Sequence, residues 1–154
     1  MGNQEKFLEA ITTGYTFKGD SIILGAAMLD KETQTGSLIR IPLKTLNRHG
    51  LIAGATGTGK TKTLQGIAES LSDKSIPVLL MDIKGDLSGL AAASDGHVKI
   101  DERHAKIGHP WKAQNYPVEI LSISEEKGVR MRATVSEFGP VLISKILDLN
   151  DTQA

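Results

Sequence analysis

One glycine-rich stretch, residues 54–61, constrains the fold of this chain more than any other feature. It reads Gly54-Ala55-Thr56-Gly57-Thr58-Gly59-Lys60-Thr61 and matches the pattern G-x-x-x-x-G-K-[ST] at every defined position. The pattern describes a phosphate-binding loop, provided that a strand enters it and a helix leaves it. A short apolar run, 50–53, precedes the loop. The residues after it are apolar at helical spacing, namely Leu64, Ile67, Ala68 and Leu71. The sequence therefore predicts a strand, a P-loop and a helix in this order.

The residue types in this stretch suit the phosphates of a nucleotide. Glycines allow the backbone to turn so that successive N–H groups point at one anion, and the helix N-terminus adds partial positive charge. Lys60 is expected to reach the β- and γ-phosphates, and the Thr61 hydroxyl is expected to bind Mg²⁺. We prefer this interpretation to a glycine-rich turn without a ligand, and we predict ATP and Mg²⁺ as cofactors bound by residues 54–61.

Composition sets limits on the class of protein. The 154 residues are 40% hydrophobic and 23% charged, which is typical of one globular domain. Eighteen basic residues balance eighteen acidic ones, so bulk charge gives no argument for nucleic acid or an anionic membrane. There is no cysteine, no apolar run near the roughly 18 residues of a membrane span, and no signal-peptide pattern. We therefore expect a cytoplasmic protein without membrane association.

A second apolar run, 77–81, ends in Asp82. With the first run and the intervening helix it predicts a right-handed βαβ unit with parallel strands. The ligand of such a unit binds at the carboxyl ends of the strands, where the P-loop and Asp82 would meet. Asp82 is therefore a candidate catalytic and metal-binding residue beside Lys60 and Thr61. The alternative is that Asp82 supports the loop near the phosphates without touching the metal.

The region before the P-loop predicts a helix and a hairpin. Apolar residues share one face over 1–13, and the two apolar segments 21–29 and 37–43 flank a polar stretch that ends in a glycine. Pro42 has no N–H for a ladder, so the second strand is expected at a sheet edge.

The region after Asp82 predicts shorter elements. We expect a small helix over 99–107, a half-buried strand over 118–123 and an extended segment over 128–135. Arg130 and Arg132 lie on one face of that segment, where they either meet DNA or a neighbour's nucleotide, or are simply exposed. A last helix is expected to be capped by Ser136 and closed by Asn150 in a left-handed conformation.

Four stretches together resemble one known family. They are residues 46–53 leading into the P-loop, 81–87, 132–136 and 147–153. These stretches resemble the bacterial HerA-like ATPases of the HerA/FtsK group, in particular the branch that contains YjgR. The resemblance implies a RecA-like P-loop NTPase core and a hexameric motor that uses Mg-ATP to move DNA. Under this interpretation, 1–46 form an N-terminal helix and β-hairpin segment, and 47–154 form the N-terminal part of the ATPase domain.

The resemblance also implies parts that these 154 residues do not contain. In the group, an acidic pair on a later strand completes the Mg²⁺ site, and an arginine from a neighbouring subunit follows. The early strand of the group carries Asp-x-Lys-Gly-Asp, which corresponds here to Asp82, Lys84 and Asp86. A solvated turn is the alternative interpretation for Lys84 and Asp86. We therefore expect an α/β P-loop core that is incomplete and preceded by a small hairpin segment.

Three classes of function stay open on the sequence. The first is an ATPase that resembles HerA-like translocases and helicases. The second is a nucleotide-binding module that does not hydrolyse ATP in this form. The third is a kinase or GTPase type of P-loop protein, although the Asn-Lys-x-Asp motif of GTPases and a kinase-like cluster of arginines are not found.

Overall fold

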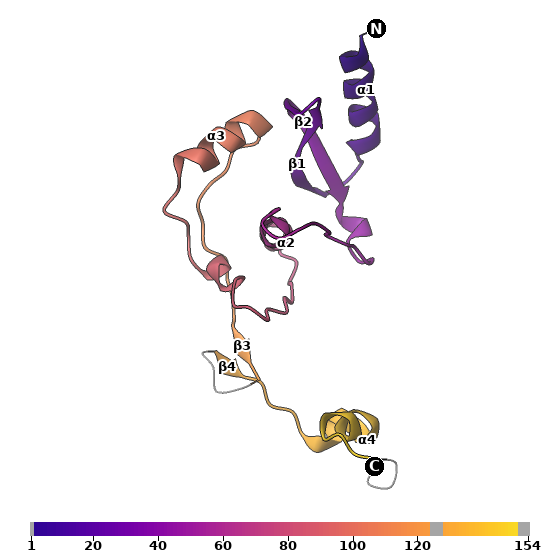
Figure 1. Cartoon of the computed structure of the whole chain (residues 1–154), viewed down its shortest axis with the longest axis vertical. Coiled ribbons are helices and arrows are strands. Elements are labelled where there is room, and N and C mark those ends of the chain that lie inside the picture. The colour runs from indigo at the N-terminus through magenta and orange to yellow at the C-terminus, as the bar shows by residue number, and fades with distance from the viewer. Residues whose placement is uncertain (1, 124–127, 151–154) are drawn as a thin grey trace. The chain divides into compact units, whose positions relative to one another are not determined.

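A computed structural model describes residues 2–123 and 128–150 (Figure 1). The chain divides into two compact units, Met1–Pro117 and Val118–Ala154. The first unit contains α1 (Asn3–Tyr15), β1 (Ser21–Leu29), β2 (Glu32–Pro42), η1 (Leu43–Thr45), α2 (Lys60–Ser72), η2 (Ser88–Ala91) and α3 (Val98–Ile107). The second contains β3 (Leu121–Ser122), β4 (Val129–Arg130) and α4 (Val135–Ile146). The described residues therefore have a mixed α/β fold.

The first unit is built on the antiparallel hairpin of β1 and β2. Ser21 pairs with Pro42 at the open end, and Leu29 pairs with Glu32 beside the turn. The turn residues Asp30 and Lys31 have φ values of 48° and 68°, as a two-residue turn between twisted strands requires. The predicted hairpin is confirmed, but β2 begins at Glu32, so the loop is tighter than the polar stretch suggested.

The small core of this unit joins the hairpin to the elements that follow the P-loop. The helices α1 and α3 contact β2, and α2 contacts β1. The buried apolar residues come from β1, α2 and the segment at η2, and are Ile22, Ala27, Ala68, Leu87 and Leu90. Of the apolar stripe of α2, Ala68 is buried and Leu64, Ile67 and Leu71 are half-buried, so this face is partly covered by its contact with β1.

The two strands expected on either side of α2 are not formed. Residues 50–53 and 77–81 have no strand assignment, and Leu51 and Met81 are about nine-tenths exposed, at 90% and 89%. Within the described residues neither run has a strand beside it, and an extended segment without a ladder partner leaves its N–H and C=O groups unpaired. The prediction of a parallel βαβ unit is therefore wrong for the described residues, and the RecA-like core is not observed there.

The second unit has a short parallel pair and one helix. Leu121 pairs with Val129 and Ser122 with Arg130, so the strand expected over 118–123 is reduced to its last part. Gly128 has a φ of 134°, and a Cβ there would lie 2.6 Å from the Ile120 carbonyl oxygen. Only glycine fits this close approach without a shift of the backbone.

The ends of α4 differ from those predicted. Thr134, not Ser136, is the N-cap, and the Thr134 N–H donates to Glu137 Oε2 at 2.6 Å. The helix ends at Ile146, and the residue in the left-handed region is Asp148, with a φ of 52°, not Asn150. The N-cap is Thr134 because Glu137 lies three residues later and completes a capping box there.

Candidate nucleotide-binding site

Two glycines of residues 54–61 have positive φ values. Gly57 and Gly59 have φ values of 81° and 90°, in the region that favours glycine. A Cβ on Gly54 would lie 2.6 Å from Thr58 Oγ1, which itself donates to the Ala55 carbonyl oxygen at 2.8 Å. The loop is therefore closed on itself by Thr58, and side chains at these glycine positions would disturb it.

The N-terminus of α2 carries backbone donors without acceptors. Gly59 is the N-cap and supplies no side-chain cap, and the first helical bond runs from the Thr63 N–H to the Gly59 carbonyl oxygen at 2.9 Å. Within the described residues the N–H groups of Gly59, Lys60 and Thr61 have no hydrogen-bond acceptor. Free donors and the helix dipole at such a helix start both favour an anion.

Lys60 lies against the loop. Its Nζ donates to the carbonyl oxygen of Ala55 at 2.7 Å. The ammonium group therefore sits over the loop that it is predicted to serve, held by a neutral acceptor. A phosphate oxygen would be the stronger acceptor, because it carries a negative charge opposite the ammonium, whereas the Ala55 carbonyl is neutral.

The carboxylate of Asp82 is engaged by the turn that follows it. Its Oδ1 accepts from the Lys84 N–H at 3.2 Å and from the Gly85 N–H at 2.8 Å, and its Oδ2 accepts from the Leu87 N–H at 2.9 Å. These bonds, that from Leu87 first, hold the pKa of Asp82 below its usual value. The observed contacts of Asp82 are thus with the backbone, which is the alternative that the sequence left open.

Asp86 is the acidic residue of this turn that forms hydrogen bonds with side chains of α2. Thr61 Oγ1 donates to Asp86 Oδ2 at 3.5 Å, and Gln65 Nε2 donates to the Asp86 carbonyl oxygen at 3.0 Å. Gln65 is only 6% exposed. The sequence left two interpretations of Asp86 open, a solvated turn and a place in the Asp-x-Lys-Gly-Asp pattern after the second apolar run.

The other residues that the sequence singled out have exposed side chains. Lys84 is exposed, and Arg130 and Arg132 are exposed residues of the second unit. Among the described residues no group of three or more His, Cys, Asp or Glu side chains is placed to hold a metal. The donors at the P-loop are a hydroxyl, carboxylates and the phosphates of a nucleotide, which are the hard oxygen ligands that Mg²⁺ accepts. The residues present therefore fit Mg²⁺ bound together with a nucleotide.

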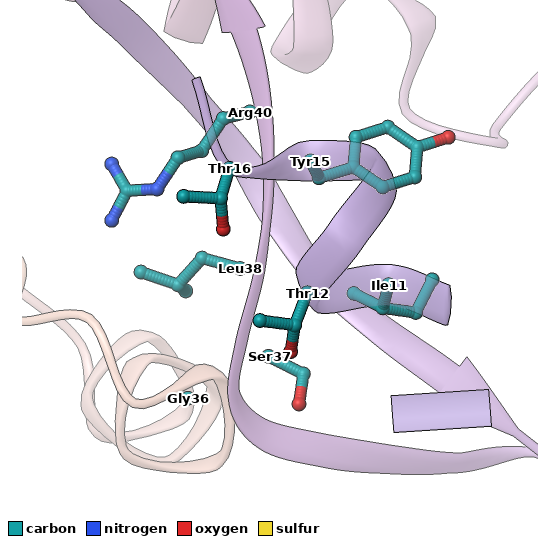
Figure 2. A pocket seen from close by; sticks show the side chains of 8 residues that line it. All are labelled: Ile11, Thr12, Tyr15, Thr16, Gly36, Ser37, Leu38 and Arg40. Atoms are coloured by element: carbon teal, nitrogen blue, oxygen red, sulfur yellow. The ribbon is translucent and has the colours of Figure 1, made fainter. Parts of the chain in front are cut away.

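A separate hollow of about 220 Å³ lies between α1 and β2 (Figure 2). Its lining residues are Ile11, Thr12, Tyr15, Thr16, Gly36, Ser37, Leu38 and Arg40. None of them belongs to the P-loop or to the turn after Asp82, so this hollow is no part of the candidate site.

No helix of residues 2–123 and 128–150 is long and apolar enough to cross a membrane.

Fold and site together define an α/β protein with a phosphate-binding sequence pattern at the start of a helix. The model of the family described as helicase HerA-like C-terminal matches residues 27–154. The chain therefore belongs to this HerA-like family, which confirms the resemblance at family level. No match was found among curated proteins or among solved structures.

Proposed function

We propose that this chain binds Mg-ATP at residues 54–61 and serves in a HerA/FtsK-type ATPase that moves DNA as an oligomer. Membership of the HerA-like family supports the ATPase class over a kinase or a GTPase. The observation that carries the proposal is the row of N–H groups without acceptors, among the described residues, at Gly59, Lys60 and Thr61, which are the last three residues of a complete G-x-x-x-x-G-K-T sequence. The proposals of DNA and an oligomer rest on family membership, and the YjgR-like branch rests on the resemblance of the sequence stretches alone.

The proposed roles follow from the positions of the donors. The N–H groups at the start of α2 bind the phosphates, and Lys60 exchanges the Ala55 carbonyl for oxygens of the β- and γ-phosphates. The Thr61 hydroxyl would hold Mg²⁺, which neutralises charge on the phosphates when it is bound. In hydrolysis, water attacks the γ-phosphorus in line, and the bond from that phosphorus to the bridging oxygen breaks. Lys60 and the loop donors stabilise the charge that develops on the γ-phosphoryl oxygens.

Asp82 has a supporting role in this proposal. Three backbone N–H groups already donate to its two oxygens, and these bonds fold the turn over 82–87. A carboxylate that leaves this arrangement to bind a metal would leave those donors without acceptors. We therefore propose that Asp82 stabilises the turn over 82–87 and does not bind the metal.

Thermal unfolding with and without nucleotide tests the proposal. A ligand that binds the native state at about a hundred times its Kd stabilises that state by about 2.7 kcal/mol. We expect Mg-ATP to raise the Tm of the chain and Lys60→Ala to abolish most of that rise. An unchanged Tm at saturating Mg-ATP would contradict nucleotide binding.

A further inference from the structure

We infer that Asp86 is a positioning residue of the nucleotide site, which orients the Thr61 hydroxyl so that its oxygen faces the Mg²⁺ of bound Mg-ATP. The inference rests on the proposed function and names an acid that the P-loop pattern does not include. It names a residue of this chain that would help the Thr61 hydroxyl to bind Mg²⁺.

The contact between Thr61 and Asp86 is the first step. Thr61 Oγ1 lies 3.5 Å from Asp86 Oδ2, at the outer limit of a hydrogen bond. A hydroxyl has one proton to donate and two lone pairs to offer. When the proton points at a carboxylate, the lone pairs are directed elsewhere and remain available to a cation.

Thr63 shows what Thr61 would otherwise do. Thr63 Oγ1 donates to the Gly59 carbonyl oxygen at 3.1 Å, which is the usual bond of a hydroxyl inside a helix to the preceding turn. Thr61 belongs to the same first turn of α2, but its hydroxyl donates to Asp86 instead. The orientation of the Thr61 hydroxyl is therefore set by Asp86 and not by a carbonyl of the helix backbone.

The position of Asp86 is fixed from two sides. Gln65, one turn after Thr61 on α2, is buried and donates its side-chain amide to the Asp86 carbonyl oxygen at 3.0 Å. On the other side Asp82 accepts from the N–H of Leu87, and Leu87 is itself buried at 8% exposure. Hydrogen bonds on both sides of Asp86 thus hold its carboxylate close to Thr61.

Asp86 suits this role better than Asp82. Among the described residues Thr61 is the only group that donates to the Asp86 carboxylate, so the carboxylate has capacity for waters around a cation. The oxygens of Asp82 are engaged by three backbone donors, and Asp82 has no contact with Thr61.

The test compares nucleotide affinity with and without the metal. Labelled ATP is titrated into the wild-type chain and Asp86→Asn, once with Mg²⁺ and once with EDTA. Asparagine retains the shape and the backbone carbonyl that Gln65 binds, but it removes the charge. We expect Asp86→Asn to weaken binding about tenfold with Mg²⁺ and to leave it unchanged in EDTA, because the charge-assisted bond from Thr61 affects nucleotide binding only through the metal that the Thr61 oxygen would hold. Mn²⁺ affinity of the protein–ATP complex, read by electron paramagnetic resonance, should fall by a similar factor.

Two further variants serve as controls. Asp95→Asn removes an exposed acid outside the site and should change neither titration. Asp82→Asn disturbs the turn and should weaken binding alike in Mg²⁺ and in EDTA. If Asp86→Asn does not fold, Asp86→Glu retains the charge but displaces it, and a smaller Mg²⁺-specific loss is expected.

The outcomes separate the inference from the function on which it rests. An equal loss in Mg²⁺ and EDTA, or no loss in either, would overturn the role of Asp86 while ATP binding by the wild type stands. A wild type that binds no ATP in either condition would overturn the proposed function and the inference together.

Discussion

Gln65 Nε2 donates to the backbone carbonyl oxygen of Asp86 at 3.0 Å, and this bond ties the P-loop helix to the turn after Asp82. Gln65 is a buried polar residue of α2, and Ala68, one turn further along the helix, is also buried. A buried amide needs its partner, because an unsatisfied polar group in the interior costs free energy. The bond thus sets where the acid of the turn lies relative to Thr61.

Removing this amide should destabilise the first unit. We expect Gln65→Ala to lower the free energy of unfolding by about 1–3 kcal/mol, since the Asp86 carbonyl loses its donor and a small cavity remains. Urea unfolding followed by circular dichroism measures this free energy of unfolding. Gln4→Ala, which removes an exposed side-chain bond to Gln34, is the control and should change stability less than Gln65→Ala. Equal stability of Gln65→Ala and wild type would show that the bond does not hold the turn.

Stability should depend on the protonation of Asp82. The pKa of Asp82 is lowered in the folded state by the N–H groups of Leu87, Gly85 and Lys84. A lowered folded pKa means that the contribution is complete above the unfolded pKa, about 3.9, and disappears as pH falls through the folded value. We expect wild type to lose more stability than Asp82→Asn between about pH 5 and 2. Parallel stability curves for the two proteins would contradict this role.

The close packing of α3 on β2 gives a prediction about glycine. Gly108 has a φ of 73°, and a Cβ there would lie 2.8 Å from the Gly36 nitrogen. Nearby, Thr35 Oγ1 donates to the Lys106 carbonyl oxygen at 2.9 Å. Gly108→Ala should therefore destabilise the unit by more than about 1 kcal/mol, from backbone strain together with the clash.

Gly96→Ala is the matched control for this substitution. Gly96 has a φ of 81°, but a Cβ there would meet nothing within 4 Å. Gly96→Ala thus reports strain without the clash, and Gly108→Ala should cost more in thermal unfolding. If the two variants melt at the same temperature, α3 does not approach β2 as described.

Gly54 offers a test of the loop itself. Gly54→Ala places a methyl group against Thr58 Oγ1 and breaks the bond from Thr58 to the Ala55 carbonyl oxygen. We expect ATP affinity to fall about fivefold, as for the loss of one hydrogen bond of about 1 kcal/mol. Gly50→Ala, which meets no atom within 4 Å, should leave the affinity unchanged. Unaltered binding by Gly54→Ala would show that the closed shape of the loop is not needed.

Local features of the sequence were sufficient to predict some elements. The 3.6-residue spacing of Leu64, Ile67, Ala68 and Leu71 predicted α2, because a helix forms its hydrogen bonds within its own segment. The hairpin was predicted for a similar reason, since its two strands are neighbours in the chain and one polar turn joins them.

The runs 50–53 and 77–81 could not be predicted in the same way. An apolar run indicates only that a segment is suited to a buried strand, while a strand needs a neighbour for its ladder. The described residues contain no such neighbour for either run. The sequence pattern therefore indicates that these residues suit a strand. Whether a strand forms depends on a neighbouring strand that can pair with it.

The choice between the two acids was also beyond the sequence. Asp82 was a candidate metal ligand because it ends an apolar run. In the structure its carboxylate accepts hydrogen bonds from backbone N–H groups of its own turn. Asp86 reaches Thr61 because Gly85, with a φ of 77°, reverses the chain and Gln65 holds the next residue. The folding of one turn decides this, and residue spacing does not reveal it.

The central claim is that residues 54–61 bind the phosphates of ATP, and titration of labelled Mg-ATP into Lys60→Ala tests it most directly. The variant loses the only side-chain ammonium that lies on the loop in the described residues. Lys62→Ala, which removes an exposed lysine two positions along the same helix, controls for the loss of positive charge. We predict that Lys60→Ala weakens binding by about 1.5–3 kcal/mol, or roughly 10- to 150-fold, while Lys62→Ala stays close to wild type. Equal affinities for wild type and both variants would contradict the account and leave residues 54–61 as a structural turn.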